Sequence, residues 1–175
     1  IGLLLDESSE EKKGDSSVGV SPQYCGNLGK QANCQTAVFG TLSAGEHFSI
    51  IDSELYLPQC WVDDKERCLK AGIPNEDIQY RKKADIALAI VKRQKEAGVR
   101  FDFVAADALY GHDIDFREGL EKLNVLYVVD THKSTRIYTE PFQLEVPQRK
   151  AGARGKSPSI AKPNKEEISL NKYLE

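Results

Sequence analysis

Methionine is absent from this sequence of 175 residues, tryptophan occurs once and histidine three times. Long apolar runs are missing as well, and no segment approaches the roughly 20 apolar residues of a membrane-spanning helix. The chain begins at Ile1, inside an apolar run, and nothing there resembles a signal peptide. We therefore expect an excised fragment or a processed product without a membrane span, long enough for one domain with a full core.

Cysteine is scarce, and its spacing excludes the common metal motifs. Cys25, Cys34, Cys60 and Cys68 form no C-x-x-C pair and have no histidine at zinc-finger spacing. This pattern argues against a structural zinc site. Because no sign of secretion is present, we expect reduced and partly buried thiols.

The net charge is only −3, but the charges are unevenly distributed. Acids outnumber bases over residues 1–145, whereas residues 146–165 contain no acid and six bases, namely Arg149, Lys150, Arg154, Lys156, Lys162 and Lys165. Such a segment can bind the phosphates of DNA. It can equally be a solvated tail, and composition leaves both interpretations open.

Short apolar runs dominate the first third of the chain. Ile1–Asp6 predicts a strand, and the polar, glycine-containing Glu7–Ser17 predicts a loop. Further β-type segments are Val18–Val20, Thr36–Phe39 and His47–Leu57. Together these segments predict an antiparallel meander after the first strand.

The middle of the chain carries the clearest helix. Pro58–Tyr80, which contains Trp61, predicts a long irregular connection with a solvated surface. Arg81–Ala97 follows with apolar residues at helical spacing, and Gly98 stands where a C-terminal cap belongs. The apolar face consists of Ala84, Ala87 and Val91, with Ile86 and Ile90 beside them.

A second helix and a last strand are predicted downstream. Asp113 is expected to cap a helix whose apolar positions are Phe116, Leu120 and Leu123. Val125–Val129 is a continuous apolar run and predicts a further buried strand.

The stretch Phe101–Asp113 is predicted to supply a central strand beside the first strand of the chain. It begins as an apolar, β-favouring run and ends in Asp107, just as the first strand ends in Asp6. The helix before it permits a crossover that places the new strand parallel to the first one. Asp6 and Asp107 would then meet at the carboxyl ends of two adjacent central strands, where open α/β sheets place their sites. Two carboxylates there predict an oxygen-rich site for Mg²⁺ or Mn²⁺.

The last part of the chain has a different composition. Thr139–Asn164 predicts a linker or loop, because it contains Pro141, Pro147, Gly152, Gly155, Pro158 and Pro163. We expect a domain over residues 1–138, followed by a basic, proline- and glycine-rich segment over residues 139–175.

Several motifs together resemble the catalytic region of bacterial insertion-sequence transposases of the DDE superfamily, of the cut-and-paste type. They are IGLLLDES, SSVGVSPQYCGNLGKQANCQTAV, ELYLP, and VAADALYG followed by FREGLEKLNVLYVV. The resemblance extends from the first residue to about Tyr138. It implies an α/β, RNase H-like fold with a mixed five-stranded sheet and flanking helices.

The resemblance also implies the chemistry. Asp6 would be the first acid of the catalytic triad and Asp107 the second, and both would bind metal. The third acid would be a glutamate on a downstream helix, and we assign it to none of Glu166, Glu167 and Glu175, because none lies in the helical signature that such enzymes carry. The chain would then stop before its third acid and be inactive alone.

Two Mg²⁺ or Mn²⁺ ions would serve phosphodiester hydrolysis and strand transfer at transposon ends in the complete enzyme. The resemblance further implies DNA as substrate, a homodimer in the full-length protein and a cytoplasmic location in bacteria. The six bases of residues 146–165 are the predicted DNA-binding residues, at the start of an insertion.

Other interpretations stand beside this one. The chain could be a non-catalytic DNA- or protein-binding module derived from a transposase core. A phosphatase with Asp6 as nucleophile ranks last, because position 8 is Ser8 rather than a second aspartate. We expect Glu7 to support the site or the structure rather than bind metal, and Tyr110-Gly111 to form a turn.

Overall fold

Residues 1–148, 156 and 159–175 are described by a computed structural model, in which the chain forms two compact units, Ile1–Asp130 and Thr131–Glu175. The first unit therefore ends before the boundary that we expected after Tyr138. Each unit has its own strands and helices, described separately below.

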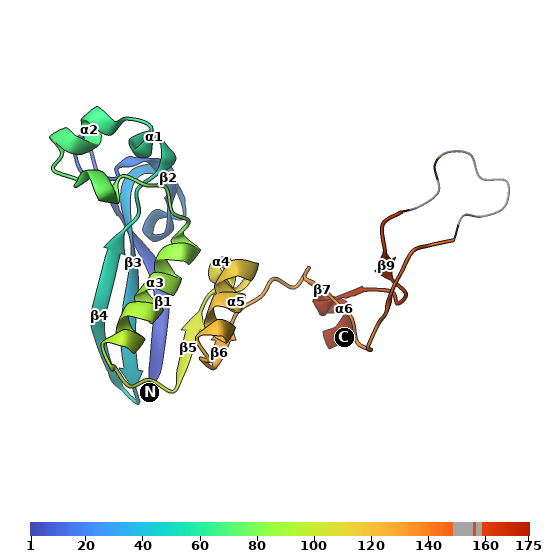
Figure 1. Cartoon of the computed structure of the whole chain (residues 1–175). Helices are drawn as coiled ribbons and strands as arrows, with labels where there is room; N and C mark the ends of the chain where they lie inside the picture. Colours follow the sequence, from blue (N-terminus) through green and yellow to red (C-terminus); the bar gives the residue numbers. More distant parts are fainter. Residues whose placement is uncertain (149–155, 157–158) are drawn as a thin grey trace. The chain divides into compact units, whose positions relative to one another are not determined.

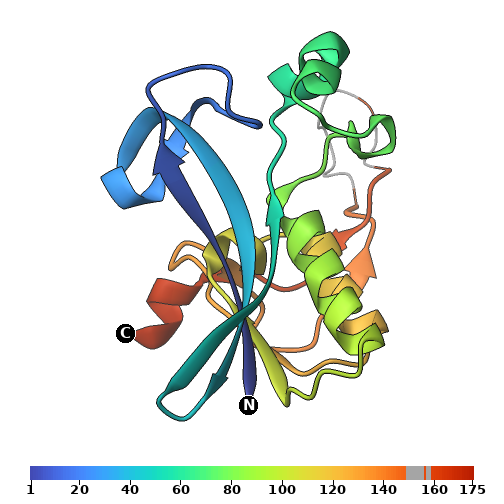
Figure 2. The same ribbon diagram turned by 90° about the vertical axis from the view of Figure 1, so that its left-hand side faces the viewer.

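The first unit is built on a mixed six-stranded sheet (Figure 1). Its strands follow one another in the order β2 (Ser21–Cys25), β3 (Lys30–Ala44), β1 (Gly2–Glu11), β5 (Phe103–Ala106) and β6 (Tyr127–Val129), while β4 (His47–Leu55) also pairs with β3. The long strands β1 and β3 are antiparallel neighbours (Figure 2). Strand β1 is parallel to β5, and β5 is parallel to β6. The predicted α/β class with a mixed sheet is confirmed.

Details of the meander differ from the prediction. The sheet has six strands rather than five, and β1 continues to Glu11, through the first part of the expected loop. The segment Val18–Val20 is a turn rather than a strand, because Gly19 adopts a φ of 75°, which glycine tolerates best. The strand begins one residue later, at Ser21, and Val20 is buried beneath it as part of a separate apolar cluster.

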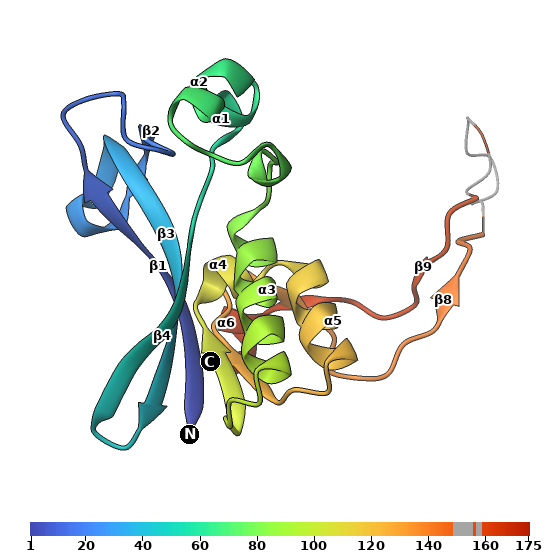
Figure 3. The ribbon, with the colours of Figure 1, turned by 60° about the vertical axis from the view of Figure 1, so that its left-hand side comes forward.

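Helices α3 (Lys83–Glu96) and α5 (Ile114–Lys122) lie side by side along the sheet (Figure 3). The five apolar residues predicted for the first of these helices are all buried. They pack on the sheet residues Leu3, Leu5, Val38 and Val104 in the main core. Gly40 of β3 permits this close packing, because a Cβ atom there would lie 2.7 Å from Cγ2 of Ile90.

Both predicted helix ends are present. The carboxylate of Asp113 accepts a hydrogen bond of 3.0 Å from the backbone N–H of Phe116 and so caps α5. Gly98 follows the last turn of α3 with a φ of 75°. These ends fix where the chain enters and leaves the helices on either side of β5.

The segment Pro58–Tyr80 is not the solvated connection that we predicted. It contains the short helices α1 (Gln59–Val62) and α2 (Lys65–Lys70) and the 3₁₀ turn η2 (Asn75–Asp77). Trp61 is fully buried with Val20, Cys68 and Ile78 in a second apolar cluster, and its indole N–H donates to the Val20 carbonyl at 2.8 Å. The charged residues around it concealed this small core in the sequence.

The run Val125–Val129 is not the buried strand that its apolar composition predicts. Only Tyr127–Val129 forms β6, and this strand lies at the edge of the sheet. The side chains of Leu126 and Val128 are 70% and 62% exposed. Tyr127 and Val129 alternate with them and pack against the core.

The second unit contains short elements. Strand β7 (Arg136–Ile137) pairs with β10 (Ile168–Ser169), β8 (Leu144–Glu145) pairs with β9 (Lys162–Pro163), and α6 (Leu170–Leu174) follows β10. Over the described residues of both units, the helices are too short or too polar to cross a membrane. All four cysteines are free thiols, and all except Cys60 are buried.

Candidate active site

The two aspartates singled out in the sequence occupy equivalent positions on adjacent parallel strands. Leu5 of β1 is paired with Ala106 of β5, and Asp6 and Asp107 follow directly on the two strands. The backbone of Asp107 is still extended, with φ −76° and ψ −175°. Because residues opposite each other on parallel strands point to the same face, both carboxylates lie on one face of the sheet at its carboxyl end.

That face is opposite the one covered by α3. Leu3, Leu5 and Val104 point into the core beneath α3, and Asp6 alternates with Leu5 along β1. Alternation along a strand therefore places Asp6 and Asp107 outside the main core. Asp6 and Asp107 are both exposed, so both carboxylates are accessible to a ligand.

Backbone donors hold each carboxylate. Oδ1 of Asp6 accepts the N–H of Glu7 at 2.8 Å. Oδ1 of Asp107 accepts the N–H of Leu109 at 2.9 Å and caps the four-residue helix α4 (Ala108–Gly111). The predicted turn at Tyr110-Gly111 is thus the end of a short helix, and Asp107 has a capping role together with its predicted catalytic one.

The pKa of Asp6 is raised above its ordinary value. The chief cause is the protein around the carboxylate, which displaces water, and the charges of Glu7 and Asp107 add to it. The hydrogen bond from the Glu7 backbone and the charge of Lys83 act in the opposite direction. The charge of Asp107 thus adds to the forces that favour the protonated form of Asp6, and a bound cation would offset this effect.

Glu7 points to the other face and is already engaged. Its Oε1 lies 3.0 Å from Nζ of Lys83, at the start of α3, and its Oε2 accepts the hydroxyl proton of Tyr110 at 2.7 Å. Burial and the charge of Glu7 raise the pKa of Tyr110, so the phenol remains a donor. This network was not predicted, because nothing local in the sequence connects residues that lie so far apart along the chain.

Oxygen ligands from two carboxylates suit Mg²⁺, which proteins bind through one or two carboxylates with water and substrate phosphate completing the shell. Over the described residues, no group of three or more His, Cys, Asp or Glu side chains forms a metal cluster. Asp6 and Asp107 would therefore supply two carboxylate ligands, and the remaining ligands would come from elsewhere.

Two of the three glutamates considered for the third acid have contacts within the second unit. Glu167 pairs with Arg136 at 3.5 Å, and Glu175 accepts a hydrogen bond of 3.0 Å from Asn171. Nothing in these contacts assigns the third acid. Glu166 is exposed and likewise remains unassigned.

The predicted DNA-binding residues are only partly described. Arg149, Lys150 and Arg154 lie outside the described residues, whereas Lys156 and Lys162 are exposed. Lys165 is exposed too, but it pairs with Glu140 at 2.9 Å. The second unit therefore presents some of the predicted cations to solvent, and one of them already has an acidic partner.

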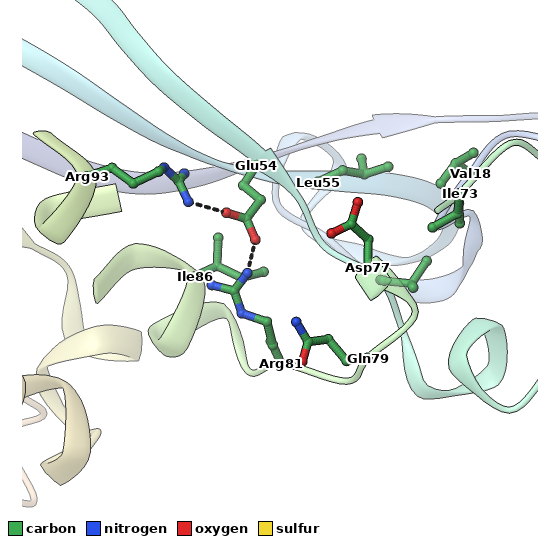
Figure 4. A pocket seen from close by; sticks show the side chains of 10 residues that line it. Val18, Glu54, Leu55, Ile73, Asp77, Gln79, Arg81, Ile86 and Arg93 are labelled. Atoms are coloured by element: carbon green, nitrogen blue, oxygen red, sulfur yellow. Dashed lines mark hydrogen bonds and ion pairs between the residues drawn. The ribbon is translucent and has the colours of Figure 1, made fainter. Parts of the chain in front are cut away.

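A pocket of about 410 Å³ lies elsewhere in the first unit, between β4 and the start of α3 (Figure 4). Glu54 stands at its edge between Arg81 and Arg93, and Arg93 also binds Asp52 at 3.1 Å. Burial alone would raise the pKa of Asp52, but hydrogen bonds from Arg93 and Gln94 outweigh it, so that pKa is lowered. These ion pairs attach α3 to β4, and neither Asp6 nor Asp107 lines the pocket.

Comparison with known proteins gives two matches. A family model described as "DDE superfamily endonuclease" matches residues 1–172. The curated protein "Probable transposase for insertion sequence element IS701" of Microchaete diplosiphon is 37% identical over 146 residues, which is 82% of this chain and 35% of that protein. The chain thus spans about a third of the length of this relative. No solved structure gives a significant match.

Proposed function

Since this chain belongs to the DDE superfamily of endonucleases, we propose that it carries two of the three catalytic acids, Asp6 and Asp107, of an insertion-sequence transposase. The observation that carries the proposal is the shared position of the two aspartates at the ends of adjacent parallel strands, on one face of the sheet. The mixed sheet with flanking helices agrees with the RNase H-like fold of this superfamily.

Asp6 and Asp107 would hold the divalent ions of the reaction through their carboxylate oxygens. Two such ions, about 3.5–4 Å apart in enzymes of this chemistry, supply an activated water and stabilise the leaving oxygen of a phosphodiester. The chain itself orients the ligands, because the N–H groups of Glu7 and Leu109 each hold one oxygen of a carboxylate.

The substrate of the complete protein would be DNA at transposon ends, first hydrolysed and then joined to a target. The exposed cations of residues 146–165 would contact DNA phosphates, and the complete protein would act as a homodimer. The third acid would come from a part of the complete protein outside residues 1–175, so the isolated chain would be inactive.

The test is cleavage of DNA that carries the ends of the parent element by the full-length protein in Mg²⁺. Asp6→Asn and Asp107→Asn should each slow nicking roughly a hundredfold or more, because they remove a ligand that supports several kcal/mol of transition-state stabilisation. Asp115→Asn is the matched control, since Asp115 is exposed and pairs only with Lys82 at 3.4 Å among the described contacts.

Equal rates for all three variants would contradict the assignment of the two acids. If DNA binding persisted without any cleavage by the full-length protein, the non-catalytic binding module would become the better interpretation. Efficient cleavage by residues 1–175 alone would show that the third acid lies within this chain.

A further inference from the structure

Glu7 connects three elements around the two catalytic aspartates. It follows Asp6 on β1, and its carboxylate binds Lys83 of α3 through one oxygen and Tyr110 of α4 through the other. Helix α4 begins immediately after Asp107. The Glu7–Tyr110 hydrogen bond therefore joins the strand that carries Asp6 to the helix that Asp107 caps.

Helix α4 depends on such contacts for its position. Four residues are too few for a helix that is stable by itself, because helix formation needs a costly first turn. Tyr110 anchors it: the side chain is fully buried, and its ring lies 5.9 Å from the ring of Phe116. Its hydroxyl ends at Glu7, so the apolar ring and the polar tip are both held.

The hydrogen bond between Tyr110 and Glu7 is stronger than a hydrogen bond between two neutral groups. Its length of 2.7 Å and the charge of the acceptor are those of a charge-assisted hydrogen bond. The acceptor is oriented in turn by Lys83, whose side chain is only 20% exposed. The Glu7 carboxylate is held by two donors from two helices, so it has little freedom to rotate. The segment of β1 that carries Glu7 is restrained in the same way.

We propose that Glu7 and Tyr110 are positioning residues, whose hydrogen bond fixes α4 against β1 and thereby sets Asp107 at the separation from Asp6 that a shared divalent ion requires. The inference rests on the proposed function, because it assumes that Asp6 and Asp107 bind a divalent ion together. Glu7 lies on the opposite face of the sheet from Asp6, and its two carboxylate oxygens already bind Lys83 and Tyr110, so its role is to position the site rather than to bind metal.

The first arm of the test asks whether the bond holds α4. Tyr110→Phe removes only the hydroxyl and keeps the buried ring, and Glu7→Gln keeps the shape but removes the charge. The N–H of Gly111 donates to the Asp107 carbonyl at 2.9 Å, so its hydrogen exchange, followed by NMR, reports opening of α4. We expect exchange roughly tenfold faster in Tyr110→Phe and a smaller increase in Glu7→Gln, whose amide oxygen can still accept.

Tyr127→Phe is the matched control. The Tyr127 hydroxyl also donates to a carboxylate, that of Glu121 at 2.9 Å, but it lies on β6 and joins neither aspartate-bearing segment. Exchange at Gly111 should be unchanged in this variant. An exchange rate in Tyr110→Phe no higher than in Tyr127→Phe would overturn the inference, whatever the metal does.

The second arm asks whether the bond positions the acids. Mn²⁺ is titrated into the same NMR samples, and its broadening of the Glu7 and Ala108 amide signals gives the affinity. Tyr110→Phe should bind Mn²⁺ roughly tenfold more weakly although every ligand remains, as is common when residues that orient metal ligands are changed. Tyr127→Phe should bind like the unmodified chain.

Asp6→Asn and Asp107→Asn distinguish metal binding by the two aspartates from the positioning role of Glu7 and Tyr110. If both abolish the broadening while Tyr110→Phe leaves it intact, the acids bind metal and the positioning role is wrong. If neither Asp→Asn variant changes the broadening, the two aspartates do not bind Mn²⁺. The proposed function and the positioning role are then both wrong, even if exchange at Gly111 is faster in Tyr110→Phe. Faster exchange combined with weaker Mn²⁺ binding in Tyr110→Phe supports the inference.

Discussion

Asp6 shows at the scale of one residue what a partly desolvated carboxylate costs the fold. Its pKa is raised, first by loss of water around the carboxylate and then by the charges of Glu7 and Asp107. The folded chain therefore binds this proton more tightly than the unfolded chain does. The free energy of unfolding consequently decreases as the pH rises from 3.8, the ordinary value, through the raised pKa of the folded state.

Asp6→Asn should accordingly raise the melting temperature of the metal-free chain at pH 7, because it removes a charge that the folded state disfavours. The gain over the unmodified chain should shrink as the pH falls towards about 3.8, where Asp6 becomes protonated in both states. Thermal unfolding followed by circular dichroism from pH 3 to pH 8 measures this difference. A variant less stable than the unmodified chain at pH 7 would contradict the account.

Some residues could be predicted from the sequence because their signal is local. Asp113 caps α5 as predicted, since a cap depends on residues three positions apart. The link between Glu7 and Tyr110 depends on two residues far apart in the chain, and only the folded sheet brings them together. The roles of Asp6 and Asp107 in catalysis remain predictions, although the strands place both acids as the sequence indicated.

Helix α4 is the element on which the site geometry depends most. Its last residue, Gly111, packs directly on the chain after β6, because a Cβ atom there would lie 2.1 Å from the Asp130 carbonyl oxygen. Backbone atoms cannot yield as the end of a flexible side chain can. The helix, the strand end at Asp107 and the end of β6 are thus packed as one piece.

Gly111→Ala should therefore lower the free energy of unfolding by about 1–3 kcal/mol, as overpacking commonly does. Gly26→Ala is the control: Gly26 also lies in a short helix, η1 (Gly26–Leu28), and no atom beyond its neighbours lies within 4 Å of the added Cβ. Urea denaturation of both variants measures the difference. Equal stabilities would show that α4 can shift away from Asp130 at little cost.

Elements whose apolar residues recur at a regular spacing were predicted well, and elements without such a spacing were not. Helix α3 shows its apolar face directly in the sequence. The run Val125–Val129 is apolar throughout, and such a run does not reveal whether one face or both are covered. Trp61 lies among charged residues, so its burial follows from packing between α1, α2 and the turn before β2 rather than from any pattern.

At the scale of the whole molecule, the chain combines an acidic body with a basic segment. A DNA-cleaving protein must bring a polyanion to carboxylates that repel it, and the cations of residues 146–165 would offset this repulsion. The chain covers 35% of the curated transposase that it matches.

Replacement of the six bases by glutamine should weaken DNA binding and reduce the dependence of log affinity on log salt by up to about 5, at roughly 0.9 for each phosphate contact. Replacement of Lys13, Lys70 and Lys122, which are exposed on the first unit, is the control and should change the slope little. Fluorescence anisotropy with duplex DNA at several salt concentrations measures both. An unchanged slope would mean that residues 146–165 are a solvated segment without a role in DNA binding.

The central claim is that Asp6 and Asp107 share a divalent ion, and the most direct measurement is an anomalous difference map from crystals grown with Mn²⁺. The account predicts a peak between the two carboxylates, at roughly 2.1 Å from an oxygen of each, the bond length typical of Mg²⁺. The peak should disappear in Asp107→Asn crystals. Carboxylates that point to opposite faces of the sheet, or Mn²⁺ bound only at other side chains, would contradict it.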